Sequence, residues 1–414
     1  MQKFEQTITK QGTPLFVFPM PHVQSVAAGV LVFAGSRDEV WPKEAGIAHA
    51  LEHMLFQGNE RLGSSAAIAG EIERCGGVIN ARTASEMTFH YRVVPSDAFG
   101  VAVASLASQV AMPLLRSSDI AKEMQNVVQE CRMYHDMPDA FCSIQFEYAV
   151  HGEHPLGKFV LGTEEAILAF DRDDFHRFWN SFYRPENYIF LAVGNTTLPE
   201  AETSFSGRDF GAPTTLGRNT RARESGVATG IRRINERDIQ QAHVCLGTSI
   251  GASDNPDTKA LSLFKTMLSG GASFPLFQEV RQKLGLCYHI RADVDTWSDR
   301  GVFQIYIGTD PVRIGEAIER IHGVIRESAQ DEGLFEKART FLLGRNAVNF
   351  VDPQKILERA YLDVVFEGTP KTPDEIRVEL EAQTFEGVHA AVERWLLDQS
   401  RYSYSYVVPV GTKI

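Results

Sequence analysis

The chain repeats one order of strands and helices in its two halves, and this repeat is the strongest constraint on its fold. In the first half, the apolar strand AAGVLVFAGSRDE leads into a helix that ends in EHMLFQG. In the second half, QAHVCLGTSIGASDNPD leads into a helix that ends in FKTMLSGG. Further strands in each half alternate apolar and polar residues, which is typical of antiparallel sheets with one covered face. The sequence therefore predicts an α+β fold of two duplicated domains, each a mainly antiparallel sheet covered by helices.

Between the halves lies a segment that is poor in large apolar residues and rich in Gly, Ser, Thr and Arg. Its sequence, FSGRDFGAPTTLGRNTRARESGVATG, is typical of a solvated linker. A chain of 414 residues is also too long for a single hydrophobic core. We therefore expect an N-terminal domain over residues 1–205, a linker over residues 206–230 and a homologous C-terminal domain over residues 231–414.

Composition excludes several classes of protein. A net charge of −12 argues against nucleic-acid binding, because neutralising phosphates needs a basic face. No run of about 18 apolar residues is present, so we expect no membrane span. The five cysteines are widely spaced without a CxxC pair, which favours reduced thiols. The first residues lack a basic segment followed by an apolar one. Together these features predict a cytoplasmic protein.

The stretch HALEHMLFQG carries the chemistry of the first half. A helix is expected over residues 43–57, between Pro42 and Gly58. On it, His49 and His53 are four residues apart and Glu52 shares their face. Two histidines at this spacing can bind one zinc ion. Zinc lowers the pKa of a water molecule towards neutrality, and Glu52 would take its proton.

The second half provides an internal control for this motif. Chance alone gives a His-x-x-acid-His string about 0.04 times in a chain of this composition. Aligning EHMLFQG with FKTMLSGG places Leu261, Phe264 and Lys265 near the positions of the two histidines and the glutamate. The repeated fold therefore does not require these polar groups, which favours a functional interpretation.

A catalytic zinc needs a third protein ligand from another element. The segment SDIAKEMQNVVQECRMYHDMP has the apolar periodicity of a helix and carries Glu123 and Glu130 two turns apart on one face. Either glutamate could reach the ion. A pair of surface glutamates is also common on helices, so the residues alone leave both the choice of ligand and its existence open.

The spacing His49, Glu52, His53 and, after 76 residues, Glu130 resembles the zinc signature of the pitrilysin/insulinase family of metallopeptidases, in the short two-domain form of bacterial homologues of the mitochondrial processing peptidase. The blocks EAGIAHALEHMLFQG, HPLGKFVLGTEE and FPLFQEVRQKLGLCYHI also resemble family blocks. The resemblance implies that both histidines and Glu130 bind one zinc ion per chain and that Glu52 is the catalytic base. It also implies that Glu123 orients the ligands.

The resemblance further implies how substrate is held. The segment GGVINARTASEMTFHY resembles the family's exposed edge strand, which pairs with an extended peptide through backbone hydrogen bonds. Asn80 and Ala81 would contact the peptide near the scissile bond. Arg281 and Tyr288 resemble a family pair that donates hydrogen bonds to the substrate and to the developing oxyanion. Gly285 predicts that a helix ends between these two residues.

The length of the chain is relevant to its expected oligomeric state. Long family members fuse four such domains into two bowls that close as a clamshell, whereas this chain has the domains of one bowl. The resemblance therefore predicts a zinc metalloendopeptidase that cuts unfolded or extended peptides in an enclosed chamber. It predicts a homodimer in which Arg281 and Tyr288 act on the partner's zinc. Two alternatives stay open: a non-catalytic scaffold subunit of the same fold, and one subunit of a hetero-oligomeric processing peptidase.

Overall fold

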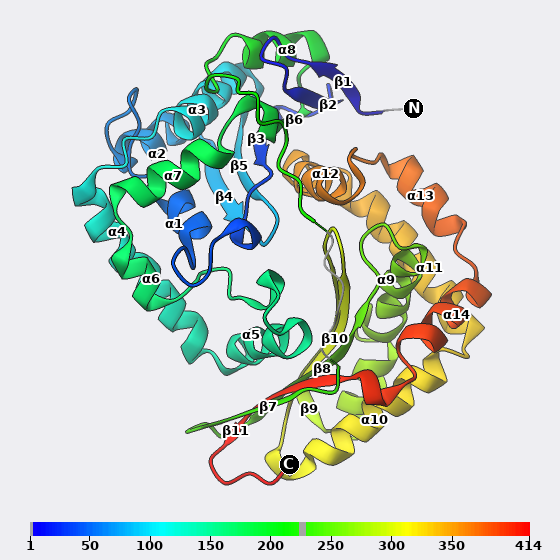
Figure 1. Cartoon of the computed structure of the whole chain (residues 1–414). Coiled ribbons are helices and arrows are strands. Elements are labelled where there is room, and N and C mark those ends of the chain that lie inside the picture. The colour runs from blue at the N-terminus through cyan, green and yellow to red at the C-terminus, as the bar shows by residue number, and fades with distance from the viewer. Residues whose placement is uncertain (1–2, 223–228) are drawn as a thin grey trace. The chain divides into compact units, whose positions relative to one another are not determined.

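Two β-sheets organise the chain in the computed structural model, which describes residues 3–222 and 229–414. Each sheet is the centre of one compact unit, and both units are assembled from three segments of the chain (Figure 1). Unit 1 consists of Met1–Arg132, Phe159–Arg221 and Asn349–Pro373. Unit 2 consists of Met133–Lys158, Ala222–Val348 and Asp374–Ile414.

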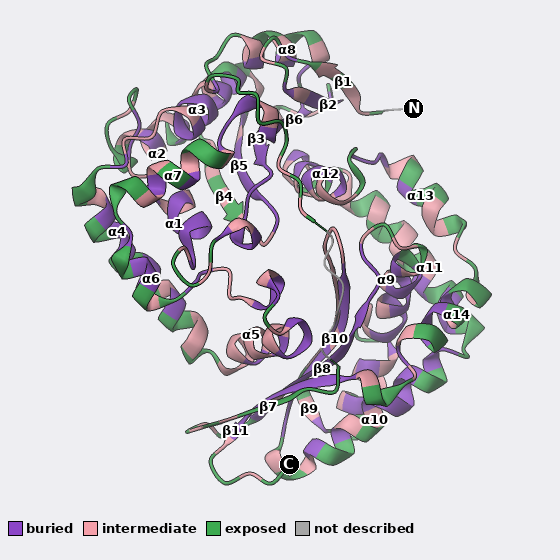
Figure 2. Cartoon of the chain, in the orientation of Figure 1, coloured by how far each residue is buried: buried purple, intermediate pink, exposed green. Residues whose placement is uncertain are grey.

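The sheet of unit 1 has six strands in the order β1-β2-β6-β3-β5-β4. Only the β2–β6 pair is parallel. The bounds are β1 (Glu5–Ile8), β2 (Pro14–Pro19), β3 (Ser25–Val32), β4 (Val78–Thr83), β5 (Thr88–Pro95) and β6 (Tyr188–Gly194). Strands β3, β5 and β6 are buried along most of their length, whereas edge strand β4 alternates exposed and half-buried residues (Figure 2).

Helices cover both faces of this sheet. Along β5, Phe89 and Tyr91 pack in a cluster with helix α12 (Pro353–Glu367), while the alternate residue Arg92 hydrogen-bonds to α3 (Phe99–Ala111). Successive side chains of a strand point to opposite faces of the sheet, so alternate residues of β5 contact the two helical layers. The remaining helices that begin in unit 1 are α1 (Ile47–Met54), α2 (Ser65–Glu73), α4 (Ser117–Asp136), α6 (Glu164–Ala169), α7 (Arg172–Phe182) and α8 (Leu198–Ser206).

Unit 2 repeats this plan with five strands in the order β7-β11-β8-β10-β9, of which only the β7–β11 pair is parallel. The strands are β7 (Arg232–Arg237), β8 (Ala242–Ile250), β9 (Cys287–Thr296), β10 (Gly301–Thr309) and β11 (Ser403–Pro409). The helices are α5 (Pro138–His151), α9 (Pro256–Ser269), α10 (Ile314–Ser328), α11 (Glu332–Asn349), α13 (Pro373–Glu381) and α14 (Phe385–Trp395). The predicted α+β fold with two similar, mainly antiparallel sheets is confirmed.

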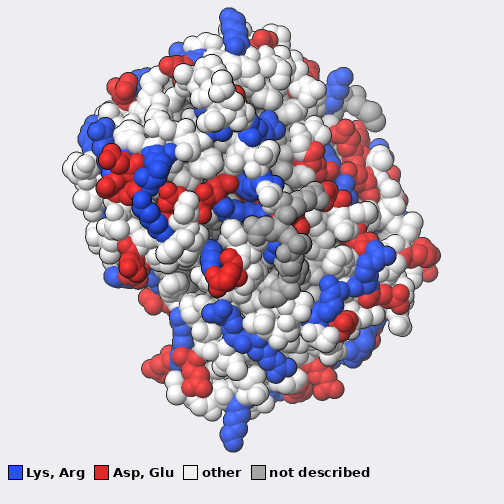
Figure 3. All heavy atoms as spheres, in the orientation of Figure 1, with Lys and Arg blue, Asp and Glu red and all other residues white. Residues whose placement is uncertain are grey.

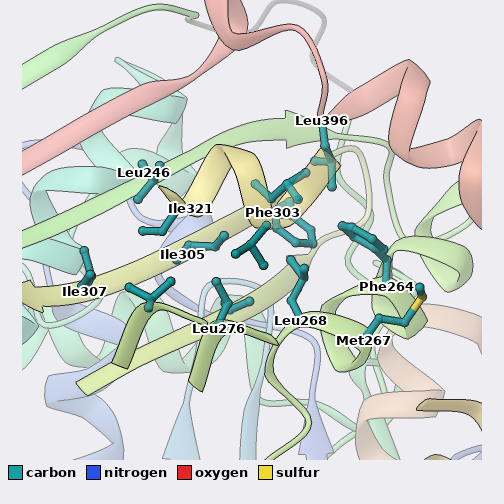
Figure 4. Packing of buried hydrophobic residues seen from close by; sticks show 14 of the residues in the cluster. Leu246, Phe264, Met267, Leu268, Leu276, Phe303, Ile305, Ile307, Ile321 and Leu396 are labelled. Atoms are coloured by element: carbon teal, nitrogen blue, oxygen red, sulfur yellow. The ribbon is translucent and has the colours of Figure 1, made fainter. Parts of the chain in front are cut away.

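The main core of unit 2 lies between its sheet and α9, α10 and α14. Figure 4 shows Phe264 and Leu268 of α9 packed with Phe303 and Ile305 of β10. Leu261 and Phe264, which stand where the first half has its motif, are both fully buried. Two of the motif's three polar positions are thus taken by core residues, while the third, Lys265, is half-buried, as expected for a half in which this helix has only a structural role.

The compact units divide the chain differently from the predicted domains at residues 1–205 and 231–414. Helix α5 of the first half packs on the second sheet through Cys142, Phe146 and Val150. Helix α12 of the second half packs on the first sheet. A sequence repeat records the order of elements along each half, but it contains no signal for this exchange of covering helices.

The described part of the predicted linker, residues 206–230, lies against unit 1 as far as Arg221. Phe210 is fully buried, and the Arg221 guanidinium forms an ion pair with Asp38 and donates to the Glu86 carbonyl oxygen at 2.9 Å. Residues 223–228 of this segment are outside the described residues. The polar composition of the segment reflects hydrogen-bonded anchoring as well as exposure.

The surface mixes charges of both signs. On the face shown in Figure 3, acidic and basic side chains lie among one another. Ion pairs such as Arg61–Glu71 and Arg320–Glu327 are examples of this mixing. Within the described residues, no helix combines the length and apolar character that crossing a bilayer requires.

Candidate metal centre

Helix α1 carries both histidines of the motif but is shorter than the predicted helix over residues 43–57. It spans Ile47–Met54 and begins after Gly46, whose φ of 92° is left-handed. A Cβ on Gly46 would lie 2.3 Å from the Leu161 carbonyl oxygen. The predicted start was therefore wrong, because the chain turns sharply at this glycine to pass close to another segment.

A buried carboxylate caps this helix from a distance. Glu39 accepts hydrogen bonds from the backbone N–H groups of Gly46 at 2.9 Å and Ala48 at 3.0 Å. Both are among the N–H groups at the start of α1 that lack a partner within the helix. Burial raises the pKa of Glu39, against the effect of these two hydrogen bonds. The first turn of α1, which carries His49, is thus fixed by a residue ten positions upstream.

Three side chains converge in unit 1, from α1 and the adjoining α4. The Nε2 atoms of His49 and His53 lie 3.7 and 3.4 Å from Oε2 of Glu130. One ligand atom from each residue lies within 4.8 Å of the others, and this is the only such His/Cys/Asp/Glu group found among residues 3–222 and 229–414. The structure thus brings together the three residues expected to bind the metal.

The donor set fits a zinc ion. Ligand atoms about 2.1 Å from a tetrahedral zinc are about 3.4 Å apart, close to the two separations between the histidine nitrogens and Glu130. Those separations are long for direct hydrogen bonds, so a shared cation would satisfy these atoms better than they satisfy one another. Two imidazole nitrogens and one carboxylate oxygen are ligands that zinc prefers, and three protein ligands are typical of a catalytic site.

Glu123 orients His53 rather than joining the ligand group. Its Oε1 lies 3.0 Å from Nδ1 of His53, and its Oε2 accepts hydrogen bonds from Gln57 at 2.8 Å and Asn126 at 3.0 Å. A carboxylate on Nδ1 fixes the ring so that Nε2 faces the metal position. The geometry therefore agrees with the roles that the resemblance implied, with Glu130 as the ligand candidate and Glu123 as the residue that orients a ligand.

The two histidines have opposite charge preferences. Burial, with a contribution from the neighbouring His53, lowers the pKa of His49 to about 4. Burial also acts against charge on His53, but the carboxylates of Glu123 and Glu130 outweigh it and raise the pKa of His53 to about 9. At neutral pH and without metal, His49 is therefore neutral and His53 carries a proton between two carboxylates.

This difference predicts how zinc affinity depends on pH. Zinc binds neutral imidazole, so below pH about 9 it must displace the proton of His53, while His49 has none to lose. The apparent affinity should rise about tenfold per pH unit, or about 100-fold from pH 6.5 to 8.5. Titration against a zinc chelator at each pH measures it. In Glu123→Gln the apparent zinc affinity should stop rising at a lower pH than in wild type. A zinc affinity of wild type that does not change with pH contradicts the expectation.

Glu52 lies on the same helix, beside the ligand group. Its Oε2 accepts a hydrogen bond from the Thr83 hydroxyl at 2.5 Å. Burial raises the pKa of Glu52, partly offset by this hydrogen bond and by the charge of His53. A carboxylate whose pKa is raised is better matched to accept a proton near neutral pH.

The predicted substrate strand lies at an open sheet edge. Strand β4 is the last strand of its sheet and, within residues 3–222 and 229–414, pairs only with β5. Asn80 is exposed, and its Oδ1 accepts a hydrogen bond from the backbone N–H of Ala81 at 2.9 Å. That N–H therefore points away from β5, towards the position of an added strand. The predicted edge location of Asn80 and Ala81 is confirmed; their contact with substrate stays a prediction.

Arg281 and Tyr288 are brought together within unit 2. The Arg281 guanidinium lies 4.7 Å from the centre of the Tyr288 ring, in a cation–π arrangement. Arg281 belongs to a π-helix over Leu276–Lys283, and Tyr288 is in edge strand β9 with 78% of its surface exposed. The predicted helix end is confirmed, because Gly285 has a left-handed φ of 56°. The metal group belongs to the other unit.

Several supporting residues were not found from the sequence. Glu39 and Thr83 contact α1 from other elements, so no periodicity relates them to the motif. Gln57 and Asn126 did carry a signal, because they follow His53 by four residues and Glu123 by three within the two predicted helices, although α1 itself ends before Gln57.

Comparison with protein families gives two adjacent matches. Residues 19–164 match the model described as insulinase, peptidase family M16, which contains the metal group. Residues 169–342 match the model described as the peptidase M16 inactive domain. An uncharacterized zinc protease of Rickettsia bellii is 33% identical over 346 residues, 82% of each chain. One of Mycobacterium bovis is 31% identical over 402 residues, 95% of this chain and 90% of that protein.

Solved structures share the fold. A protease from Helicobacter pylori superposes with a TM-score of 0.90 at 19% identity, covering 99% of this chain and 100% of that one. A peptidase M16 inactive domain from Pseudomonas fluorescens gives 0.89 at 18% identity, covering 100% and 99%. With relatives above 30% identity over nearly the whole chain, and with both family models matched in order, this chain belongs to the insulinase family, peptidase family M16.

Proposed function

We propose that this protein is a zinc-dependent endopeptidase that hydrolyses extended peptides. The observation that carries the proposal is the convergence of His49, His53 and Glu130 within 4.8 Å, with a further carboxylate on the same helix. Three ligands and a separate acid–base group are the minimum that zinc-dependent hydrolysis needs. The names of the related zinc proteases support the same class of enzyme.

In the proposed reaction each residue has a defined task. His49, His53 and Glu130 would hold zinc, which when bound polarises carbonyl groups and lowers the pKa of water. Glu52 accepts the proton of the attacking water and delivers it to the leaving amine. Its raised pKa supports this double use, because a base that is too weak or too strong fails in one of the two steps.

The substrate would bind as an added strand along β4. The N–H of Ala81 points outward and donates to the side-chain oxygen of Asn80, an exposed residue, so a peptide carbonyl group would take the place of that oxygen. Backbone pairing selects extended chains with little regard to sequence. We therefore propose unfolded or extended peptides as the substrate class.

Arg281 and Tyr288 would complete the site from a second copy of the chain. Both side chains are donors, and Tyr288 is exposed, so they can stabilise negative charge on a substrate carbonyl oxygen. The proposed active form is a homodimer in which this pair faces the partner's zinc. Each chain has one metal group, in unit 1, and one Arg281/Tyr288 pair, in unit 2, so a dimer would contain two complete sites.

Removing a ligand tests the metal site. Wild type is expected to bind about one zinc per chain, whereas Glu130→Gln should retain less than about a tenth of it at the same free zinc, because two histidines alone hold zinc weakly. Glu123→Gln should weaken binding by about 10- to 100-fold without abolishing it. Metal analysis after chelator-buffered dialysis measures all three.

The matched control is Asp119→Asn, which changes a carboxylate in the first turn of the same helix, paired with Arg116 at the surface. It should bind zinc as wild type does. If wild type binds no zinc and cleaves no peptide when zinc is supplied, the metal-site proposal is contradicted and a scaffold or hetero-oligomeric subunit is favoured.

A further inference from the structure

Thr83 connects the edge of strand β4 to Glu52. Its hydroxyl donates to Oε2 of Glu52 at 2.5 Å, and its backbone N–H also hydrogen-bonds to this carboxylate. Successive residues of a strand point their N–H groups in alternate directions. Ala81 and Thr83 are two residues apart, so both N–H groups point outward from the sheet. Glu52 therefore lies at the end of the same sheet edge on which the N–H of Ala81 points outward and donates to the side chain of Asn80.

The hairpin turn that follows Thr83 is held firmly. The buried side chains of Arg37 and Glu86 form an ion pair at 2.6 Å, and the Gly35 backbone packs so closely that a Cβ there would lie 2.1 Å from the Ala84 carbonyl oxygen. Arg221 donates to the carbonyl of Glu86. The Thr83 hydroxyl lies just before this tightly packed turn. Because its own position is restricted, it can restrict the position of another side chain.

We propose that Thr83 is the positioning residue of the general base, and that it sets the orientation of Glu52 relative to a peptide paired along β4. The inference rests on the proposed function, because it assigns a role within that site. A glutamate side chain has three rotatable bonds, and two donors from one strand residue restrict it to a single arrangement. Pairing of the substrate and placement of the base then share one rigid element.

Steady-state kinetics with peptide substrates tests the role. Thr83→Val keeps the β-branched shape and removes the hydroxyl. It should lower kcat by about 10- to 100-fold, as expected for the loss of a hydrogen bond to a charged group, with KM changed by less than about twofold. Thr83→Ser restores the hydroxyl and should recover most of kcat. Thr7→Val, on β1 at the opposite edge of the sheet, should match wild type.

A second readout does not depend on activity. In metal-free protein, the loss of thermal stability caused by Thr83→Val should be smaller in a Glu52→Ala background, because the hydrogen bond is already absent there. The effect of Thr7→Val should be the same in both backgrounds. Zinc content should be unchanged in Thr83→Val.

The outcomes separate this inference from the proposed function. An inactive wild type contradicts the proposed function, while the stability cycle still tests the coupling of Thr83 to Glu52. The inference is overturned if kcat of Thr83→Val equals that of wild type, if the serine variant fails to recover it, if zinc is lost, or if the stability effects of the two substitutions are additive.

Discussion

Glu52→Gln is expected to keep its zinc and lose peptide cleavage by about 10²- to 10⁴-fold, the range that a general base contributes. The amide has nearly the shape of the carboxylate and can still accept the hydrogen bond from Thr83. It cannot take a proton from water. Because the ligand group of His49, His53 and Glu130 is untouched, metal content should stay at the wild-type level. Metal analysis and cleavage of a quenched fluorescent peptide library measure both quantities.

The control for this substitution is Glu44→Gln, an acidic residue just before α1 whose half-buried carboxylate pairs with the exposed side chain of Arg177. It should retain wild-type cleavage and zinc. Cleavage by Glu52→Gln at the wild-type rate would assign the proton transfer to another group. Loss of zinc would instead show that the carboxylate helps to hold the metal, and the kinetic result would then say nothing about a base.

The sequence predicted those features of the fold that depend on order and periodicity. The strand orders β2-β6-β3-β5-β4 and β7-β11-β8-β10-β9 correspond one to one, which is what a duplicated chain requires. The exchange of α5 and α12 between the sheets was not predictable in this way, because nothing in the residue pattern of either helix indicates which sheet it covers. Which sheet they cover is decided by packing partners distant in the chain, such as Cys142 with strand β11.

The residues of the candidate site also fall into those that spacing along one helix predicted and those that it did not. His49, Glu52 and His53 share one helix, so their spacing alone placed them together. Glu130 lies on another helix, where helical periodicity alone does not distinguish it from Glu123. The resemblance to the family signature assigned the two roles, and the contact of Glu123 with Nδ1 of His53 agrees with that assignment. Thr83 lies in a strand whose residues look interchangeable in sequence. Its hydrogen bond to Glu52 appears only in the structure, where the end of β4 contacts α1.

If the active form is the proposed dimer, two variants that are each inactive should regain peptidase activity when they pair with one another. Arg281→Ala should lower kcat by about 10²- to 10³-fold, as loss of an oxyanion donor does, and Glu52→Gln should be inactive as above. If Arg281 acts on the partner's zinc, a mixed dimer has one complete site, formed by the base of one chain and the arginine of the other. Random pairing of equal amounts should give about a quarter of wild-type activity.

Co-expression of the two variants with different tags, and purification through both, isolates the mixed dimers. The control pairs Glu52→Gln with the double variant carrying both substitutions, which leaves no complete site in either arrangement and should stay inactive. If the purified mixed dimers are no more active than the sum of the separate variants, Arg281 does not act across the interface. A chain that sediments as a monomer while fully active contradicts the proposal by another route, since every residue of the site must then come from one copy.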